Sequence, residues 1–575
     1  MLQQLLYILC ISLICCSWGL PPLLLLKRSL FTDAVWYRSK AGLIAFLFLL
    51  GCMTLGLLSS WLYLFIPLRY PMVLTLTGLQ LLITLGTGHG RLMRLWSSLP
   101  SSGPLNGLPL FFFIICIFLF LLLGCLPTAN TDTRIYHLQI VEWASRYPAV
   151  PGIANLFPRL GLGSNWLLLI GSFHIPGRND FFHLNSALVI WLFVWLFHQW
   201  YYHWRNGSHR QLSLFYFLLL AYSLFDWELF RNTASSTSYD PIVTTCLLLL
   251  LCCWVECILL DGKEPAPSLL FVSIALSALG FKLSGFFVLI LLAYHLFRHR
   301  RLPYYGIFTA IAFLVIVTPV LVKNYIITGY PLFPLPLSIG RPDWQLPTGM
   351  LKHLNNYIVL SNRFLNSPFV NSIAFREHHA LWFASWFKAL VPQHKLIILL
   401  TVVSIVTVFI HKKWPGGHRN IRIIMLLLLL MEIAWFFTAP SPRFSYASLL
   451  CTAFLPLSLL IGQAIPDALY RIGMLIAICS ILIYIPVRMN ASFHATTLLR
   501  PQPFSNVDDR PLSIDGVQYH HPERPVKGYF CLLGSLPLPC TCQINPFLQP
   551  RGPSLSDGFR MSPAPDSVFV HQYNY

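Results

Sequence analysis

Ionisable and hydrogen-bonding side chains are concentrated in one short stretch of a chain that is otherwise poor in charge. Only 10% of its 575 residues are Asp, Glu, Lys or Arg, against about 25% in soluble domains. Residues 126–166 nevertheless contain Asp132, Arg134, Tyr136, His137, Glu142, Arg159 and Asn165. Because ionisable groups beside an apolar span are costly to hold there, we interpret this stretch as the wall of an active site.

The chemistry that this stretch could perform is proton transfer next to a lipid headgroup. Asp132 follows an apolar run, residues 108–126, by a few positions. A carboxylate there could deprotonate or orient a hydroxyl group, and nearby cations could stabilise a departing phosphate. His137 and Glu142 are further catalytic candidates on a predicted amphipathic helix, residues 133–146. The residues alone leave open that Asp132 only caps this helix, that His137 makes local hydrogen bonds and that Glu142 is solvated.

Long apolar runs make up most of the chain and must position these residues. With 56% hydrophobic residues, the chain is typical of polytopic helical membrane proteins. We predict an all-α transmembrane bundle of about fourteen spans with a small external C-terminal tail. Residues 162–174 are apolar but short, and we predict that they are interfacial or re-entrant. The predicted spans are 2–24, 41–66, 71–89, 108–126, 181–202, 211–226, 239–260, 267–281, 284–297, 303–322, 395–411, 421–438, 444–462 and 468–487.

Basic residues in short loops predict the orientation of the spans. The net charge is +19, and much of it lies in loops that alternation of the spans places on one side, which is typical of cytoplasmic loops. Those loops are residues 27–40, 90–107, 203–210, 298–302 and 412–420. The segments 127–180, 227–238, 323–394 and 488–575 are then external. Since no basic soluble domain is present, nucleic acid is not an expected partner.

Polar residues from distant segments are predicted to converge on the external side. Asp240 lies at the mouth of a span, Lys282 at a break between two apolar runs, Lys323 near the end of a span and Arg443 just before another. Independent snorkelling side chains would scatter over both faces. The predicted substrate-binding residues are Arg134, Tyr136, Arg159, Asn165, Asp240, Lys282, Lys323 and Arg443.

The predicted organisation has three regions: N-terminal transmembrane helices at 1–107, a transmembrane core at 108–487 with external loops 127–180 and 323–394, and the external tail at 488–575. Cys531 and Cys540 would face an oxidising compartment, so a disulfide is expected, although the sequence does not settle it. Cys540 and Cys542 lack further ligands at metal-binding spacing, so no metal site is predicted. A divalent metal requirement stays open, and no P-loop, dinucleotide or zinc motif predicts another cofactor.

Several motifs resemble a family of bacterial polytopic membrane proteins of unknown activity. The resemblance is carried by DTRIYHLQIVEWASRYPAVPGIANLFPRLGLGSNW at 132–166, FKLSG at 281–285, NYIITGYPLFP at 324–334 and SPRFSYAS at 441–448. It continues into the tail, through LPLPCT at 536–541 and NPFLQPRGPSLSDGFR at 545–560. It therefore covers most of the chain from about residue 108 onward.

That family more distantly resembles the GT-C superfamily of membrane glycosyltransferases. GT-C enzymes take sugars from polyprenyl-phosphate carriers and use an acid in the first external loop, to which Asp132 corresponds. Their acids are often paired, whereas Asp132 stands between two threonines. The resemblance implies hexosyl or pentosyl transfer from a polyprenyl-phosphate donor to a glycan, lipid or protein acceptor at the outer face of the bacterial cytoplasmic membrane. The alternatives are a flippase, polymerase or transporter of lipid-linked glycans, and a non-enzymatic assembly protein.

Overall fold

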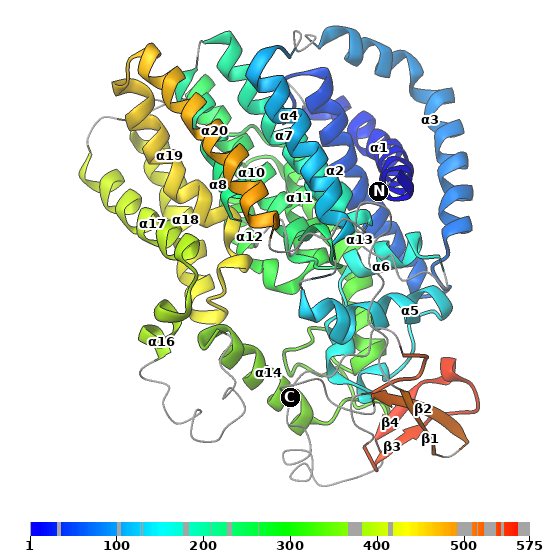
Figure 1. The fold of residues 1–575 in the computed structure, drawn as a ribbon. Helices are drawn as coiled ribbons and strands as arrows, with labels where there is room; N and C mark the ends of the chain where they lie inside the picture. The colour runs from blue at the N-terminus through cyan, green and yellow to red at the C-terminus, as the bar shows by residue number, and fades with distance from the viewer. Residues whose placement is uncertain are drawn as a thin grey trace.

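The computed structural model is a helical bundle, as the apolar runs predict (Figure 1). It describes residues 2–30, 36–99, 105–126, 128, 130–175, 183–207, 209–226, 233–262, 264–365, 382–411, 414, 418–490, 509–514, 516–522, 536–541 and 545–561. The helices at the predicted spans are α1 (Leu2–Leu30), α2 (Lys40–Tyr63), α3 (Tyr70–Ser98), α4 (Gly107–Cys125), α7 (His183–Asn206), α8 (Arg210–Phe225), α10 (Asp240–Asp261), α11 (Leu269–Phe281), α12 (Val288–Arg298), α13 (Pro303–Thr328), α17 (Pro392–Ile410), α18 (His418–Thr438), α19 (Tyr446–Ala464) and α20 (Asp467–Asn490). The all-α fold class is confirmed.

Ten helices in the described part of the chain are long and apolar enough to cross a membrane. They are α1, α2, α3, α4, α10, α13, α17, α18, α19 and α20. Helices α8, α11 and α12 are apolar but shorter, and α7 is not among the ten. The protein is therefore a multi-pass membrane protein, while the count of about fourteen spans stays a prediction.

Helices α11 and α12 form a hairpin whose apex is the single 3-10 turn η5 (Leu283–Phe287). Lys282 ends α11 in an extended conformation, with φ −157° and ψ 125°. At the other end of the hairpin, Arg298 of α12 pairs with Glu264, which precedes α11, at 2.9 Å. Helix α11 therefore begins, and helix α12 ends, at the same end of the bundle, and the turn between them lies towards the opposite end.

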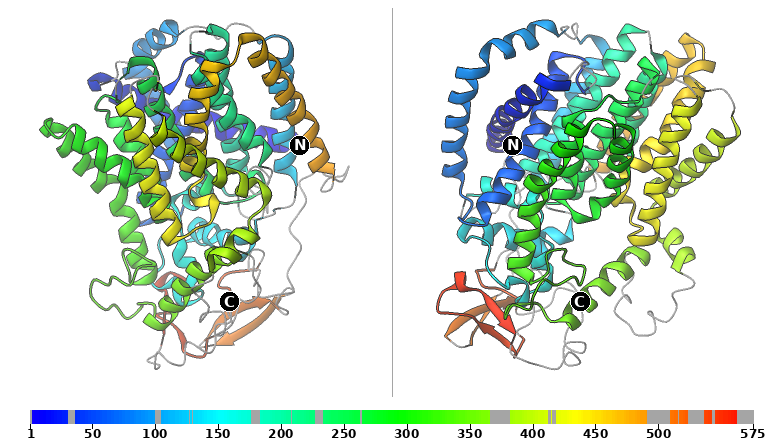
Figure 2. Two further views of the ribbon diagram at one scale, coloured as in Figure 1. Left: turned by 90° about the vertical axis from the view of Figure 1, so that its left-hand side faces the viewer. Right: turned by 180° about the vertical axis from the view of Figure 1, so that it is seen from behind.

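One end of the bundle carries the short elements and the strands; we call it the polar end (Figures 1 and 2). Its helical elements are η2 (Thr133–His137), α5 (Leu138–Arg146), η3 (Ile153–Asn155), η4 (Pro158–Leu162), α6 (Asn165–Phe173), α14 (Thr348–Arg363), α16 (Trp382–Ala389) and η7 (Pro442–Phe444). With nine residues, α6 extends only about 14 Å. It is too short to cross a membrane, as we predicted for residues 162–174.

The described part of the tail packs on the segment that follows α5. It contains two antiparallel hairpins, β1 (Asp509–Ile514) with β2 (Val517–Pro522) and β3 (Leu548–Pro550) with β4 (Phe559–Met561), and the turn η9 (Leu555–Asp557). The N–H of Phe559 donates to the Pro151 carbonyl at 3.0 Å, and the Phe559 ring meets Trp143 edge-on. The predicted disulfide cannot be followed, because Cys531 lies outside the described residues. The division at residues 107 and 487 stays a prediction.

Candidate functional site

Five charged side chains from separate segments meet at the polar end, and we call them the ionic cluster. Asp132 lies 3.8 Å from Arg159 and 3.9 Å from Arg443, measured between carboxylate oxygens and guanidinium nitrogens. Asp240 lies 3.6 Å from Arg443 and 2.5 Å from Lys282. A continuous chain of charges therefore runs from Arg159 through Asp132, Arg443 and Asp240 to Lys282.

Each member of the ionic cluster lies where a helix starts or is interrupted. Asp132 directly precedes η2, a π-helical turn, and such turns are frequent at functional sites. Arg159 and Arg443 follow prolines at the start of the short turns η4 and η7. Asp240 is the first residue of α10, where the helix dipole favours a negative charge. Lys282 lies at the apex of the α11–α12 hairpin, so all five reach one place without a charge in the middle of a helix.

The charges in the ionic cluster are neither balanced nor tightly paired. Three cations face two carboxylates, which leaves one positive charge in excess. Three of its four contacts are 3.6–3.9 Å long, beyond the usual length of about 2.7–2.9 Å for a charged hydrogen bond. The side chain of Arg443 is 48% exposed and that of Asp132 27%. The cluster can therefore accept an anion from outside.

Aromatic rings fix the cations of the ionic cluster in position. The Lys282 ammonium lies 3.8 Å from the centre of the Phe444 ring and 5.1 Å from that of Tyr239. The Arg159 guanidinium lies 4.7 Å from the Tyr357 ring, which α14 supplies. Such contacts attract cations without neutralising them. The cluster thus keeps its positive charge while the side chains are held still.

His137 is buried beside the ionic cluster in η2. Its Nδ1 lies 3.1 Å from the Thr237 hydroxyl, and its buried Nε2 has no hydrogen-bond partner among the described residues. Burial lowers the pKa of His137 to about 4, with Asp132 and Asp240 acting against this shift. The imidazole is therefore neutral near pH 7 and can donate or accept one proton.

Two further candidates in η2 have different surroundings. The Tyr136 hydroxyl lies 3.1 Å from that of Tyr239, and burial raises the pKa of Tyr136 well above its usual value, as does the charge of Asp132. Tyr136 therefore stays protonated beside the carboxylate. Arg134 is half-buried, and burial lowers its pKa.

Glu142 makes its ion pairs outside the ionic cluster. On α5, its carboxylate lies 3.1 Å from Arg146 and 3.0 Å from His174, at the end of α6. Burial alone would raise the pKa of Glu142, but His174 and Arg146 together hold it below its usual value. These contacts tie α5 to α6. Its catalytic role stays a prediction.

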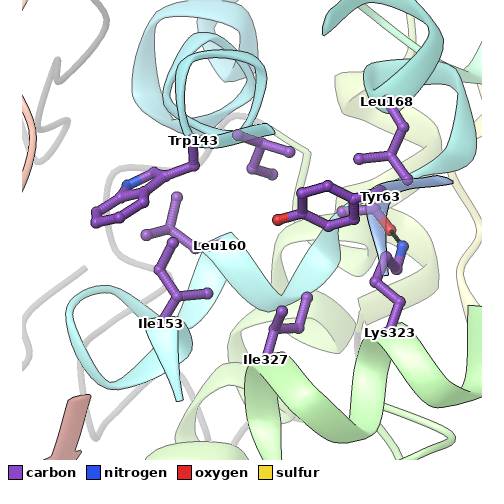
Figure 3. A pocket seen from close by; sticks show the side chains of 9 residues that line it. Tyr63, Trp143, Ile153, Leu160, Leu168, Lys323 and Ile327 are labelled. Carbon is purple, nitrogen blue, oxygen red and sulfur yellow. Dashed lines mark hydrogen bonds between the residues drawn. The ribbon is translucent and has the colours of Figure 1, made fainter. Parts of the chain in front are cut away.

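Lys323 and Asn165 border the segment that carries Arg159, on α13 and α6. The buried Lys323 ammonium donates to the Gly163 carbonyl at 2.5 Å, just after η4. Figure 3 shows this bond at the side of a small pocket lined mostly by apolar residues such as Tyr63, Leu160 and Ile327. Asn165 is buried, and its Oδ1 has no hydrogen-bond partner among the described residues. In the part of the chain that the structure describes, Lys323 forms no ion pair with the cluster.

No group of three or more His, Cys, Asp or Glu that could hold a metal ion occurs in the described ranges. Both carboxylates of the ionic cluster have cations as neighbours. Sequence reasoning missed Thr237, Tyr239, Tyr357 and Phe444, which hold the predicted residues in place. Tyr239 and Phe444 directly adjoin Asp240 and Arg443, so adjacency was a usable signal for these two, whereas nothing in the sequence marks Tyr357.

Comparison with known proteins identifies the family. A family model described as "Domain of unknown function (DUF8201)" matches residues 1–450. No curated protein and no solved structure matches significantly. The matched region includes every residue of the ionic cluster, whereas the strands of the tail lie beyond it. Because the match covers well over half of the 575 residues, the chain belongs to this family.

Proposed function

We propose that the protein is a GT-C-type glycosyltransferase that moves a sugar from a polyprenyl-phosphate carrier to an acceptor hydroxyl. The observation that carries this proposal is the ionic cluster: two carboxylates set between three cations, half open, at one end of a membrane bundle. A carboxylate for the acceptor and cations for the departing phosphate are the two components that the reaction requires.

Asp132 is the better placed of the two carboxylates to act as the base. Asp240 is held by Lys282 at 2.5 Å, whereas Asp132 has only contacts of 3.8 and 3.9 Å and is more exposed. In the proposed step the acceptor oxygen attacks the anomeric carbon and its proton passes to Asp132. The bond between that carbon and the phosphate oxygen breaks on the opposite face, which inverts the configuration.

The cations are suited to receive the phosphate that leaves. The exposed Arg443 guanidinium can offer two parallel N–H groups to phosphate oxygens, and Lys282 adds a point charge next to it. Because Arg443 also lies 3.9 Å from Asp132, a phosphate bound by Arg443 would lie beside the proposed base. Tyr136 and the neutral His137 border Asp132 and could orient the sugar.

The charge distribution supports a site at the outer face of the membrane. Helix α10 begins at Asp240 in the cluster, and its other end reaches Glu256, which pairs with Arg38. Arg298 lies at that end too, through Glu264. Loops rich in Arg and Lys are typical of the cytoplasmic side. The ionic cluster is then external, where polyprenyl-linked sugars are used by GT-C enzymes.

The substitution Asp132→Asn tests the proposal, with Asp343→Asn as a matched control on the same end of the bundle. Purified protein in liposomes would be supplied with a radiolabelled polyprenyl-phosphate sugar and a membrane extract as acceptor source. Transfer by the Asp132→Asn variant should fall by about 100-fold or more, while the control keeps the wild-type rate. Equal rates for wild type and Asp132→Asn would overturn the proposal. Translocation of the labelled lipid without transfer would instead indicate a flippase.

A further inference from the structure

A carboxylic acid lies inside the bundle, away from the ionic cluster. Glu432 is on α18, six residues before its last residue, Thr438, and so about 9 Å from that end of the helix. It is only 7% exposed. Leu428 and Trp435, which share its face of α18, are buried apolar residues. An ionisable group in such surroundings calls for a functional explanation.

The nearest polar group to the Glu432 carboxyl group is the Thr452 hydroxyl, which can donate a proton or accept one. The Thr452 hydroxyl of α19 lies 2.6 Å from Glu432 Oε1 and 2.8 Å from the Ser448 carbonyl oxygen. A threonine hydroxyl has a single proton to donate, and a carbonyl oxygen can only accept. When the Thr452 proton is on the Ser448 carbonyl, the hydroxyl oxygen can accept a hydrogen bond from a protonated Glu432. A neutral Glu432 therefore lets both contacts be full hydrogen bonds, whereas an ionised one would have to share the Thr452 proton with the Ser448 carbonyl.

No counter-ion opposes this assignment in the part of the chain that the structure describes. The elements packed against α18 include α12, α17, α19 and η5, and also α16, whose Trp382 and Trp386 rings contact Phe436 and Trp435. Among the described residues, these elements, including Lys388 of α16, place no Lys, Arg or His nitrogen within 4.0 Å of the Glu432 carboxyl group. The ionisable residues on or next to these elements have other neighbours. On α12, Tyr294 and Arg298 contact Glu264, and His295 stacks on Phe271. On α17, His394 pairs with Asp226 and Lys395 donates to the Lys388 carbonyl, while Tyr446 of α19 lies against His394 and Lys282, beside η5, pairs with Asp240. An ionised carboxylate buried without a partner is strongly disfavoured.

We propose that Glu432 is a proton-binding site within the membrane, occupied when α18 and α19 are packed as observed. Loss of the proton leaves a buried carboxylate without a counter-ion and turns the Thr452 proton from the Ser448 carbonyl towards Glu432. Helices α18 and α19 are joined through η7, which carries Arg443. The proton on Glu432 therefore lies at the contact between the two helices that flank an exposed cation of the ionic cluster. This inference does not depend on sugar transfer.

Infrared spectroscopy and carbodiimide labelling test the proton site on the full-length protein in lipid nanodiscs. Wild type should show the carbonyl band of a protonated carboxyl group, and Glu432→Gln should lack it. The matched control Glu256→Gln, which replaces a carboxylate paired with Arg38, should instead lose a carboxylate band. A Glu432→Gln spectrum that keeps the protonated band and loses a carboxylate band would overturn the assignment.

Labelling of wild type needs no variant and so does not depend on correct folding of the substituted chain. Dicyclohexylcarbodiimide reacts with protonated carboxyl groups in apolar surroundings. Peptide mass spectrometry should find Glu432 modified and Glu256 unmodified, with less modification as the pH is raised from about 6 to about 10, because the reactive acid is lost. Modification of Glu256 together with an unmodified Glu432 would contradict the proposal.

Discussion

Helix α10 carries a carboxylate near each end, and the surroundings of the two are opposite in kind. Asp240 starts the helix, and Glu256 follows about 24 Å farther along it. Glu256 is fully buried and accepts from Arg38 at 2.9 and 2.5 Å and from Tyr216 at 2.7 Å. Asp240 shares Arg443 with Asp132 over distances of 3.6 and 3.9 Å, and Arg443 is half exposed.

The difference separates an ion pair that holds the fold from one that is available to a ligand. Around Glu256, short bonds from Arg38 and Tyr216 and a longer contact with His203, at 3.4 Å, close the network. They connect α10 to α7, α8 and the segment before α2. Around Asp132 and Asp240 three of the four contacts are long, only that between Lys282 and Asp240 is short, and the cations are in excess. The closed network is thus suited to hold helices together, and the open cluster is the one on which the proposed function depends.

The largest effect on folding should come from opening the closed network. In Glu256→Ala the Arg38 guanidinium loses its buried partner, which should lower the free energy of unfolding by about 3–5 kcal/mol. Thermal unfolding of the detergent-solubilised protein measures it. The double variant Arg38→Met with Glu256→Leu, which leaves no lone charge, should recover part of the loss. An unchanged unfolding midpoint in Glu256→Ala would remove the contrast between the two regions.

The open cluster should respond in activity and hardly in stability. Arg443→Ala removes a cation that would face the leaving phosphate in the proposed reaction, and it should lower sugar transfer by about 100- to 1,000-fold. Because Arg443 is 48% exposed, its unfolding free energy should change by no more than about 0.5 kcal/mol. Arg146→Ala is a matched control, since Arg146 is 50% exposed and pairs with Glu142. Equal loss of transfer in both variants would show that the rate depends on the total charge at this face and not on the position of Arg443 in the cluster.

His137 should make the open region sensitive to acid. Its pKa is lowered from 6.5 to about 4 in the folded protein, so the unfolded chain binds more protons in this range. Folding stability should therefore be complete above about pH 6.5 and fall as the pH drops towards 4, by about 3 kcal/mol at most. Unfolding midpoints of wild type and His137→Gln across this range test it. Parallel pH profiles of the two proteins would exclude His137 as the source.

The helical fold was predictable because each apolar run must satisfy its own backbone hydrogen bonds in a membrane. Every predicted span coincides with a helix, and the short apolar run at 162–174 correctly indicated a helix too short to cross, α6. The strands of the tail were not predicted. They depend on long-range contacts, such as Phe559 with Pro151, which local patterns do not reveal.

The ionic cluster was predictable to the extent that it depends on topology. Alternation of spans places Asp132, Asp240, Lys282 and Arg443 on one side, and the structure brings these four together with Arg159. It does not bring Lys323 or Glu142 into ion pairs with them. Whether residues on one side also touch depends on side-chain direction and helix packing, which spacing along the chain does not contain. The contribution of Tyr357, from the distant helix α14, could not be foreseen for the same reason.

The smallest effect is expected where an ion pair lies at the polar end but outside both networks. Asp343 is 46% exposed and pairs with Arg551 at 3.0 Å and with Arg560 at 4.0 Å, which fastens the tail to the loop before α14. Exposed pairs of this kind contribute about 0–1 kcal/mol, so Asp343→Asn should lower the unfolding free energy by less than about 1 kcal/mol and leave sugar transfer unchanged. Chemical denaturation and the transfer assay measure both quantities. A large loss of transfer in this variant would mean that the tail, by holding the segment before Arg159, controls the ionic cluster. The ion pairs of the tail would then have to be counted with the functional charges and not with the structural ones.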